Sequence, residues 1–455
     1  MSEPVVQEKI TRHLDSLTEL LDGGARHQLK RMVNGLSPAE IGDLLESLPP
    51  AKRLAVWELV DTELDGEVLV DVNDEVRAGL IRDMDADELV AAVGDLDIDD
   101  LADILSDLPD TVIRDVLTSM SRQDRERLEE VLSYPEDSAG GLMDPNVITI
   151  RADVSLDVVL RFLRARGDLP AVFDQLFVVT RDGKFRGILR LSELLTQDPG
   201  LTVDDLMETP PAVIPVDMSA REVATEFEHH DLVSAPVVDG ENRLVGRITI
   251  DDVVDVIREE AEHSVLTMAG LDEEDDIFAP VARSATRRWI WLGVNLVTAL
   301  LAAWVLRRFE PTLEQLVATA VLFPVVMSMG GIAGTQTLTL MIRGMATGQV
   351  NPRNTGVLFR KELAVGALNG IVFSLVVAAI AWFWYGRDLE LGIVMAIAIL
   401  ANLLAGALAG FLVPLVLRRL SIDPALAGGV VLTTVTDVVG ILAFVGLATY
   451  LLLGG

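Results

Sequence analysis

The sequence Leu432-Thr-Thr-Val-Thr-Asp-Val-Val-Gly440 places one carboxylate in the middle of an otherwise apolar stretch, residues 425–453. A stretch of this length crosses the hydrocarbon core of a bilayer as a helix. An ionisable side chain there costs about 2.5–3.5 kcal/mol on insertion scales, so such a residue is usually kept for function. Thr433 lies four residues before Asp437 and Thr434 three before it, on the same helical face. Hydroxyls beside one carboxylate suit a hydrated hard cation, which prefers oxygen ligands; the alternative is a structural acid bonded to another helix.

Four further apolar segments precede this one, and each is long enough to cross a bilayer. With the N-terminus inside, nine basic residues flank the cytoplasmic side and three flank the outer side. This bias predicts the orientation and puts the C-terminus outside. We therefore expect residues 283–455 to form an all-α polytopic membrane domain with five transmembrane helices. The four segments are Trp289–Leu306, Leu316–Gly334, Leu363–Trp384 and Leu391–Leu417.

The second segment carries Pro324 and the run Gly330-Gly-Ile-Ala-Gly-Thr-Gln336. Glycines let helix backbones approach closely, and a broken helix exposes carbonyls to a water-filled path. The run therefore indicates either a pore wall or a plain helix-packing motif. The pore-lining candidates are Asp437, Thr433, Thr434, Gly330, Gly331, Gly334 and Gln336. Three acids of this region are expected near segment ends: Glu310, Glu314 and Glu362.

Charge is segregated along the chain. The 455 residues carry a formal charge of −33 although half of them are hydrophobic. Residues 281–455 hold 12 basic and 7 acidic residues, so 25 basic and 63 acidic residues, a charge of −38, remain in 1–280. Such an anionic region repels nucleic acid and attracts cations. The absence of cysteine excludes disulfides and thiolate metal sites. The N-terminus lacks the apolar core of a signal peptide, so we expect 1–280 to stay in the cytoplasm.

Residues 1–134 show only the helical period, as in Ile41, Leu44, Leu45 and Leu48. The unit Asp-Leu-Leu-Glu-Ser-Leu-Pro at 43–49 returns as Asp-Ile-Leu-Ser-Asp-Leu-Pro at 103–109. This repeat predicts stacked helical hairpins, an all-α superhelical sensor domain.

Two copies of one strand–turn–strand–helix pattern follow. Leu176–Leu195 aligns with Ala235–Val254, and the turns carry the hairpin signals Asp182-Gly183 and Asp239-Gly240. The segment resembles a tandem pair of α/β CBS domains, expected at 135–200 and 201–255, with an acidic connecting helix at 256–282.

CBS pairs of this kind bind nucleotides, and their ribose-contacting pattern is Thr-x-x-Asp. The second copy has this pattern at Thr249 and Asp252, whereas the first copy reads Arg190-Leu-Ser-Glu193. The resemblance therefore implies at most one ATP or related nucleotide at the CBS pair, and purely structural use of the motif is the alternative.

Five motifs stand at the junctions and in the membrane segments: Tyr134–Gly141, Asp251–Asp255, Gly330–Gln336, Asp423–Leu426 and Thr433–Asp437. With these motifs, the order of the parts resembles the MgtE family of magnesium channels. The resemblance implies a homodimer whose pore, on the dimer axis, is lined by the second and fifth helices, where Asp437 holds a hydrated Mg²⁺. The family usually has Asn at Ile332, and Ser and Pro near Gly428 and Val430, so Mn²⁺, Co²⁺ and Ni²⁺ stay candidate ions.

The same resemblance implies gating by cytoplasmic Mg²⁺. Carboxylates at domain boundaries repel one another, and Mg²⁺ that bridges them favours a compact, closed state. The matching residues are Asp99, Asp103, Asp251, Asp252, Asp255, Glu259, Glu260, Glu262 and Asp423.

We therefore predict a divalent-cation channel of the cell membrane, surrounded by lipid and not an enzyme, since no nucleophile–base pair or phosphate loop is present. A transporter that couples a divalent cation to protons or Na⁺ is the main alternative. A CBS-type membrane sensor that does not conduct is a second one.

Overall fold

The computed structural model describes residues 17, 25–94, 96–105, 108–167, 169–170, 172–271, 277–315, 317–385 and 388–452. Positions 106–107 of the predicted repeat, and Leu316 and Leu453 at the ends of predicted segments, lie outside these residues. The chain forms two compact units, which are Met1–Glu262 with Glu274–Ala279, and His263–Glu273 with Pro280–Gly455.

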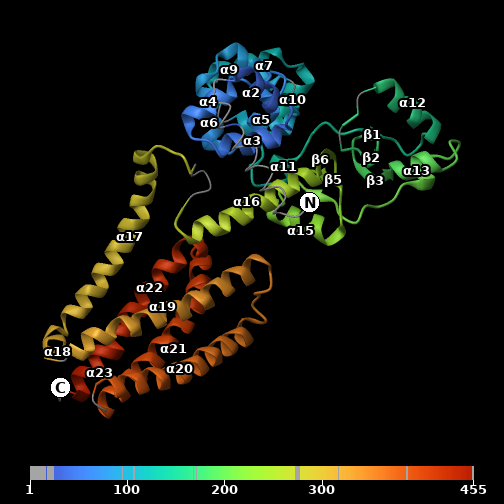
Figure 1. Ribbon diagram of the computed structural model, residues 1–455. Helices are drawn as coiled ribbons and strands as arrows, with labels where there is room; N and C mark the ends of the chain where they lie inside the picture. The colour runs from blue at the N-terminus through green and yellow to red at the C-terminus, as the bar shows by residue number, and fades with distance from the viewer. Residues whose placement is uncertain are drawn as a thin grey trace. The chain divides into compact units, whose positions relative to one another are not determined.

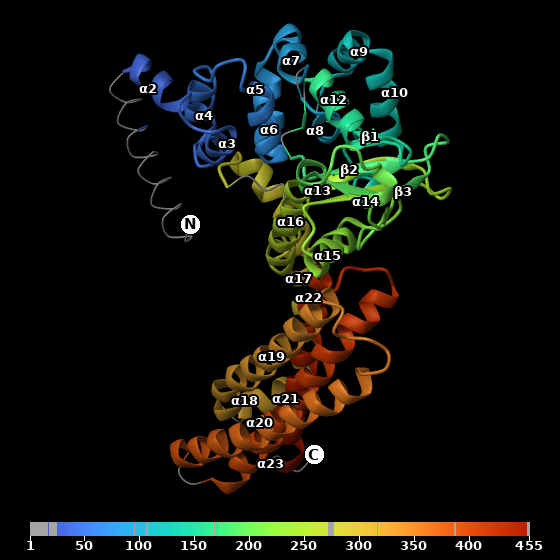
Figure 2. The same cartoon turned by 90° about the vertical axis from the view of Figure 1, so that its right-hand side faces the viewer.

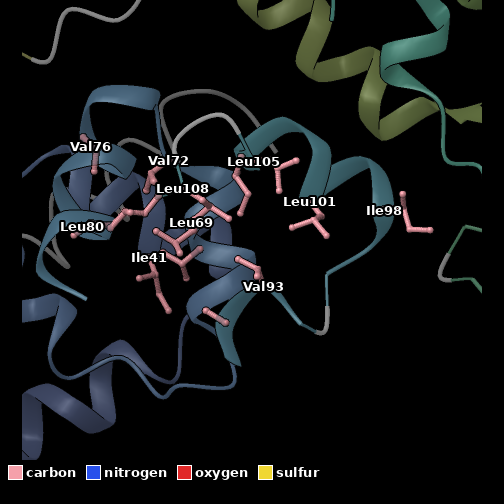
Figure 3. Packing of buried hydrophobic residues seen from close by; sticks show 14 of the residues in the cluster. Ile41, Leu69, Val72, Val76, Leu80, Val93, Ile98, Leu101, Leu105 and Leu108 are labelled. Carbon is pink, nitrogen blue, oxygen red and sulfur yellow. The ribbon is translucent and has the colours of Figure 1, made fainter. Parts of the chain in front are cut away.

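The first unit begins with short helices that share one core. Polar caps keep them short: Ser37 and Glu40 form a capping box before one helix, and Asp85 and Glu88 form another. Their apolar faces meet around Ile41, Leu69 and Leu101 (Figure 3), which confirms an all-α domain. The helices are α2 (Arg26–Val33), α3 (Pro38–Glu46), α4 (Pro50–Trp57), α5 (Asp65–Asp71), α6 (Asp74–Asp83), α7 (Ala86–Val93), α8 (Ile98–Leu105), α9 (Asp110–Ser119) and α10 (Arg122–Val131).

The predicted repeat then gives two small sheets of the same topology. In each sheet the first strand pairs parallel with the second, and the second pairs antiparallel with the third. The strands are β1 (Thr149–Ile150), β2 (Gln175–Val179), β3 (Phe185–Arg190), β4 (Ile214–Pro215), β5 (Ser234–Val238) and β6 (Leu244–Thr249). The helices beside them are α11 (Ala139–Leu142), α12 (Leu156–Arg166), α13 (Leu191–Thr196), α14 (Val203–Leu206) and α15 (Ala220–His230).

Both predicted hairpins are present, but their turns differ. Gly183 supplies the left-handed residue of the first turn, with φ of 77°. In the second turn this conformation belongs to Asn242, with φ of 60°, two residues after the predicted Gly240. The Asp239 side chain explains the shift, because its Oδ1 accepts the backbone N–H groups of Glu241 and Arg243.

The connecting helix α16 runs from Ile250 to Met268. The sequence predicted a connecting helix at 256–282, so α16 begins six residues earlier and ends fourteen residues earlier than predicted. The Asp252 carboxylate accepts the backbone N–H of Thr249 at 3.0 Å and so satisfies an amide at the start of the helix.

The second unit contains five helical stretches of 27 to 31 residues that are long and apolar enough to cross a membrane, as predicted. The α19 helix continues to Ala346 and passes through Pro324 and the glycine run unbroken, so the broken helix considered above is absent there. The elements are α17 (Val281–Arg307), α18 (Glu310–Gln315), α19 (Val317–Ala346), α20 (Thr355–Trp384), α21 (Leu389–Arg419), α22 (Pro424–Ile441), the π-helix η1 (Leu442–Gly446) and α23 (Leu447–Leu452).

Small residues set the packing of this unit. The α21 helix lies beside α19, α20 and α22 (Figures 1 and 2) and is the most buried of the five. A Cβ atom on Gly406 would lie 2.5 Å from the backbone oxygen of Gly330, so α21 and α19 touch backbone to backbone. Asn402 is fully buried, and its Nδ2 donates to the Val326 oxygen at 2.7 Å.

Candidate functional site

A cavity of about 410 Å³ opens beside Asp437 in the second unit. Three helices form its walls: α17, α19 and α22. Among the described residues no hydrogen bond or ion pair engages the Asp437 carboxylate. A membrane helix thus presents an unpaired acid to an open space. The residues that line this Asp437 cavity are Asn295, Thr298, Ala299, Met327, Ser328, Gly331, Thr433, Thr436 and Asp437.

The threonine hydroxyls of the cavity are oriented as acceptors. Thr433 donates its proton to the Val430 oxygen at 3.0 Å, and Thr436 donates to the Thr433 oxygen at 3.0 Å. Because a hydroxyl has one proton and two lone pairs, the oxygen of the part-exposed Thr433 keeps acceptor capacity toward the cavity, whereas Thr436 is fully buried. Water bound to a cation donates hydrogen bonds, so this surface favours a hydrated cation over an anion.

The size of the cavity agrees with this chemistry. Mg²⁺ prefers six oxygen ligands and gives up its waters reluctantly. Six waters occupy roughly 180 Å³ at about 30 Å³ each, and the cavity offers about 410 Å³. The volume of the cavity therefore does not exclude a fully hydrated Mg²⁺.

The predicted pore-lining residues separate into two groups. Asp437, Thr433 and Gly331 line the cavity. Gly330 and Gly334 instead lie at helix contacts, where a Cβ atom would clash with Asn402 and with Leu432, respectively. Glycine spacing alone cannot distinguish these two uses, since pores and helix contacts both need small residues. Gln336 is exposed, and Thr434 donates its hydroxyl proton to the Val430 oxygen at 2.7 Å; neither lines the cavity.

Sequence reasoning missed four polar residues of the cavity: Asn295, Thr298, Ser328 and Thr436. A signal existed for the first two, because they lie three residues apart on one face of an otherwise apolar segment. Thr436 directly precedes Asp437. On an ideal helix, adjacent residues lie on different faces, so the helical spacing did not indicate Thr436.

Glu362, expected near a segment end, is the eighth residue of the 30-residue α20, which begins at Thr355. Its side chain is buried. Its Oε2 accepts the Thr337 hydroxyl at 3.3 Å, and the Lys361 ammonium lies 3.3 Å from Oε1. It contacts Thr337 of α19 and does not line the Asp437 cavity.

In the first unit, acids of α8 lie close to acids at the start of α16. Burial, together with repulsion from Asp144 and Asp252, raises the pKa of Asp99 to about 8. Burial and repulsion from neighbouring acids raise the pKa of Asp103 to about 7, and burial raises that of Asp252 to about 6. The Asp99 Oδ1 atom is buried without a hydrogen-bond partner. Burial and mutual repulsion make it costly in free energy for these carboxylates to be ionised. A cation bound between them would lower that cost.

The remaining predicted acids are arranged differently. Asp251 accepts a hydrogen bond from the Thr249 hydroxyl, and Asp255 repels Asp71, whose pKa burial and this repulsion raise to about 6. Glu260 pairs with Arg221, and Glu262 lies 3.2 Å from the Arg258 Nε. Glu259 adds repulsion at Asp103. Among the described residues, no group of three or more His, Asp or Glu side chains forms a ready coordination shell.

Asp423 lies where α16 meets the membrane helices of the second unit. Its Oδ1 caps α22 by accepting the Ala425 N–H at 2.9 Å. Its Oδ2 lies 3.7 Å from the His263 Nε2 at the C-terminal part of α16. The connecting helix therefore contacts the start of the helix that carries Asp437.

The proposed nucleotide pair Thr249 and Asp252 is bonded to itself. The Thr249 hydroxyl donates to the Asp252 Oδ2 at 3.0 Å, beside the backbone bond that caps α16. In this structure the motif serves the helix start.

Family models match residues in all three regions but leave 260–322, which include α17 and α18, unmatched. A family described as "Divalent cation transporter" matches residues 323–447, the "MgtE intracellular N domain" matches 36–137, and the CBS domain matches 139–199 and 203–259.

Relatives carry the same arrangement. The "Magnesium transporter MgtE" of Thermus thermophilus is 34% identical over 332 residues, which are 72% of this chain and 73% of the relative. The protein of the same description from Bacillus subtilis is 32% identical over 337 residues, or 73% and 74% of the two chains. A solved cytosolic domain of the Mg²⁺ channel MgtE in complex with ATP is 29% identical, with a TM-score of 0.37, and covers 53% of this chain and 99% of that one. Because the Thermus relative matches over more than two thirds of both chains, the chain belongs to the MgtE family.

Proposed function

We propose that the protein is a channel that conducts Mg²⁺ through the Asp437 cavity. The observation that carries the proposal is the unpaired Asp437 carboxylate, which faces a cavity where the Thr433 oxygen keeps acceptor capacity. Relatives described as magnesium transporters support the choice of ion. Ile332 is 57% exposed on α19 and does not line the cavity, and Gly428 packs against Leu338, so neither departure from the family pattern alters the walls around Asp437.

We place the chain in the cell membrane as a homodimer, with the N-terminal unit in the cytoplasm and the C-terminus outside. One copy supplies one acid to its cavity, and two copies around an axis would supply two. The distribution of basic residues supports the orientation.

We further propose that cytoplasmic Mg²⁺ closes the channel. Mg²⁺ that binds between α8 and the start of α16 would relieve the repulsion among Asp99, Asp103 and Asp252. A ligand shifts a conformational equilibrium by its difference in affinity for the two states. The α16 helix is continuous from these acids to His263, which contacts Asp423 at the start of α22, so it joins sensor and pore.

One adenine nucleotide is proposed at Thr249 and Asp252 of the CBS pair. Binding would have to replace the hydrogen bonds that now join these two side chains. Calorimetric titration with ATP should show binding that Thr249→Ala weakens; equal affinity in the variant would move the site elsewhere.

Mg²⁺ uptake into proteoliposomes tests the transport proposal. Asp437→Asn should remove most of the flux, because it deletes the charge while keeping the volume of the side chain. Glu390→Gln, an exposed acid in the first turn of α21, is the matched control and should conduct as the wild type does. Equal flux in wild type and Asp437→Asn would overturn the assignment of the pore. Competition by Mn²⁺, Co²⁺ and Ni²⁺ would then rank the ions.

A further inference from the structure

We propose that α17 forms a third wall of the ion pathway, where the Asn295 amide and the Thr298 hydroxyl contact the water shell of the passing cation. The proposal rests on the proposed function, since it concerns the same Asp437 cavity. It assigns specificity-determining residues to a helix that the sequence marked only as a membrane span.

The first argument is the pattern of polar residues in α17. Between Ile290 and Ala303, Asn295 and Thr298 are the only side chains besides Trp291 that carry hydrogen-bonding groups. They lie three residues apart and therefore share one face. Polar groups inside a membrane face the bundle interior or a water-filled cavity, because lipid cannot satisfy them.

The neighbouring apolar positions differ from the pair in that they do not line the cavity. Leu296 and Leu300 are each 60% exposed and lie outside it, whereas Asn295, also exposed, and the part-exposed Thr298 line it. Ala302 is the one buried residue of α17, whose packing on the bundle is through α22. Because little of α17 is buried against other helices, a tight helix contact does not explain the presence of Asn295 and Thr298.

The second argument is the hydrogen-bonding state of the pair. The Thr298 hydroxyl donates to the Asn295 backbone oxygen at 2.9 Å, which leaves its oxygen as an acceptor toward the cavity. This is the same arrangement that Thr433 has on α22. Among the described residues, the Asn295 side-chain amide has no hydrogen-bond partner, so its carbonyl oxygen is available to a water molecule.

The consequence concerns how a hydrated ion is held. The hydration shell of Mg²⁺ is octahedral and points protons in all directions. The α22 wall offers the Asp437 carboxylate and the Thr433 hydroxyl, and α17 offers an amide and a hydroxyl from another helix. Acceptors on two sides select an ion that keeps its water shell, whereas an ion that sheds its waters gains less from them.

Cysteine accessibility tests the placement directly, because the chain has no cysteine of its own. Asn295→Cys, Thr298→Cys, Thr433→Cys and Leu296→Cys are made in the full-length protein in proteoliposomes. Each is treated with a membrane-impermeant, positively charged methanethiosulfonate with and without Mg²⁺. We expect labelling at 295, 298 and 433 that Mg²⁺ slows several-fold, and no labelling at 296.

The outcomes separate this inference from the proposed function. Labelling at 433 without labelling at 295 and 298 would overturn the α17 wall and leave the pore intact. Absence of labelling at 433 as well would overturn the pore and, with it, the wall.

Flux measurements add a readout that a purely structural role would not give. Asn295→Leu should weaken the apparent Mg²⁺ affinity about fivefold, the factor that corresponds to one hydrogen bond of about 1 kcal/mol. Asn295→Asp should strengthen it, because it adds a charge to the cavity. A loss of affinity in both variants would show that Asn295 acts through folding and would contradict the proposal.

Discussion

Single carboxylates in the membrane unit have different roles that depend on their neighbours. Asp437 faces a cavity and has no partner among the described residues, whereas Glu362 is buried and bonded to Thr337. The same residue class thus faces an open cavity at one site and a helix contact at the other. Sequence position does not separate them, because the depth of Glu362 depends on where α20 begins and on which helices cover it.

This difference gives a prediction for Glu362. Glu362→Ala should lower the free energy of unfolding by about 1–3 kcal/mol, because the buried Thr337 hydroxyl loses its acceptor. Glu362→Gln keeps an acceptor and should cost much less. Thermal unfolding in detergent measures both. Equal stability of Glu362→Ala and wild type would mean that the contact contributes nothing.

Helices are the scale at which the sequence was most informative. The five apolar spans and the two strand–turn–strand–helix copies were predictable, since length, hydropathy and turn residues encode them locally. The ends of helices were harder to predict from the sequence. At the start of α16 the Asp252 carboxylate accepts the Thr249 N–H, and hydrophobic periodicity does not reveal such a side-chain contact. Asn295 could not be assigned to the cavity because that requires knowing which face of α17 meets α22.

The contact between α19 and α21 gives a prediction at this scale. Gly406→Ala would bring a methyl group 2.5 Å from the Gly330 backbone oxygen, and a backbone atom cannot rotate away. We expect a loss of about 1–3 kcal/mol, the usual cost of overpacking. The matched control is Gly429→Ala on α22, where the added Cβ meets nothing within 4 Å. Thermal unfolding in detergent should show a lower midpoint for the first variant only; a similar shift in both would point to a general effect of losing glycine.

Over the whole molecule, the raised pKa values of acids in the first unit make its stability depend on pH. The pKa values of Asp99, Asp100 and Asp103 are raised from 3.8 to between about 7 and about 8, with burial as the largest cause. Between about pH 4 and pH 8 the folded state therefore binds more protons than the unfolded state. The stability that these groups contribute is present below about pH 4 and is lost as the pH rises toward 8.

Thermal unfolding of the full-length protein tests this linkage. Without Mg²⁺ the midpoint of the N-terminal unit should fall between about pH 5 and pH 8, and Mg²⁺ should restore it more at pH 8. Asp99→Asn should raise the midpoint at pH 8 and reduce the effect of Mg²⁺. Asp115→Asn, an exposed acid in α9, should change neither. A midpoint that rises with pH in the absence of Mg²⁺ would contradict the assignment.

The central claim is that Mg²⁺ passes through the Asp437 cavity by diffusion along its own gradient. The most direct test is the recording of unitary Mg²⁺ currents from the full-length protein in planar bilayers, in wild type and Asp437→Asn. We predict discrete currents that reverse at the Mg²⁺ equilibrium potential at any proton or Na⁺ gradient and that Asp437→Asn abolishes. A reversal potential that moves with the proton or Na⁺ gradient would contradict the channel and indicate a coupled transporter.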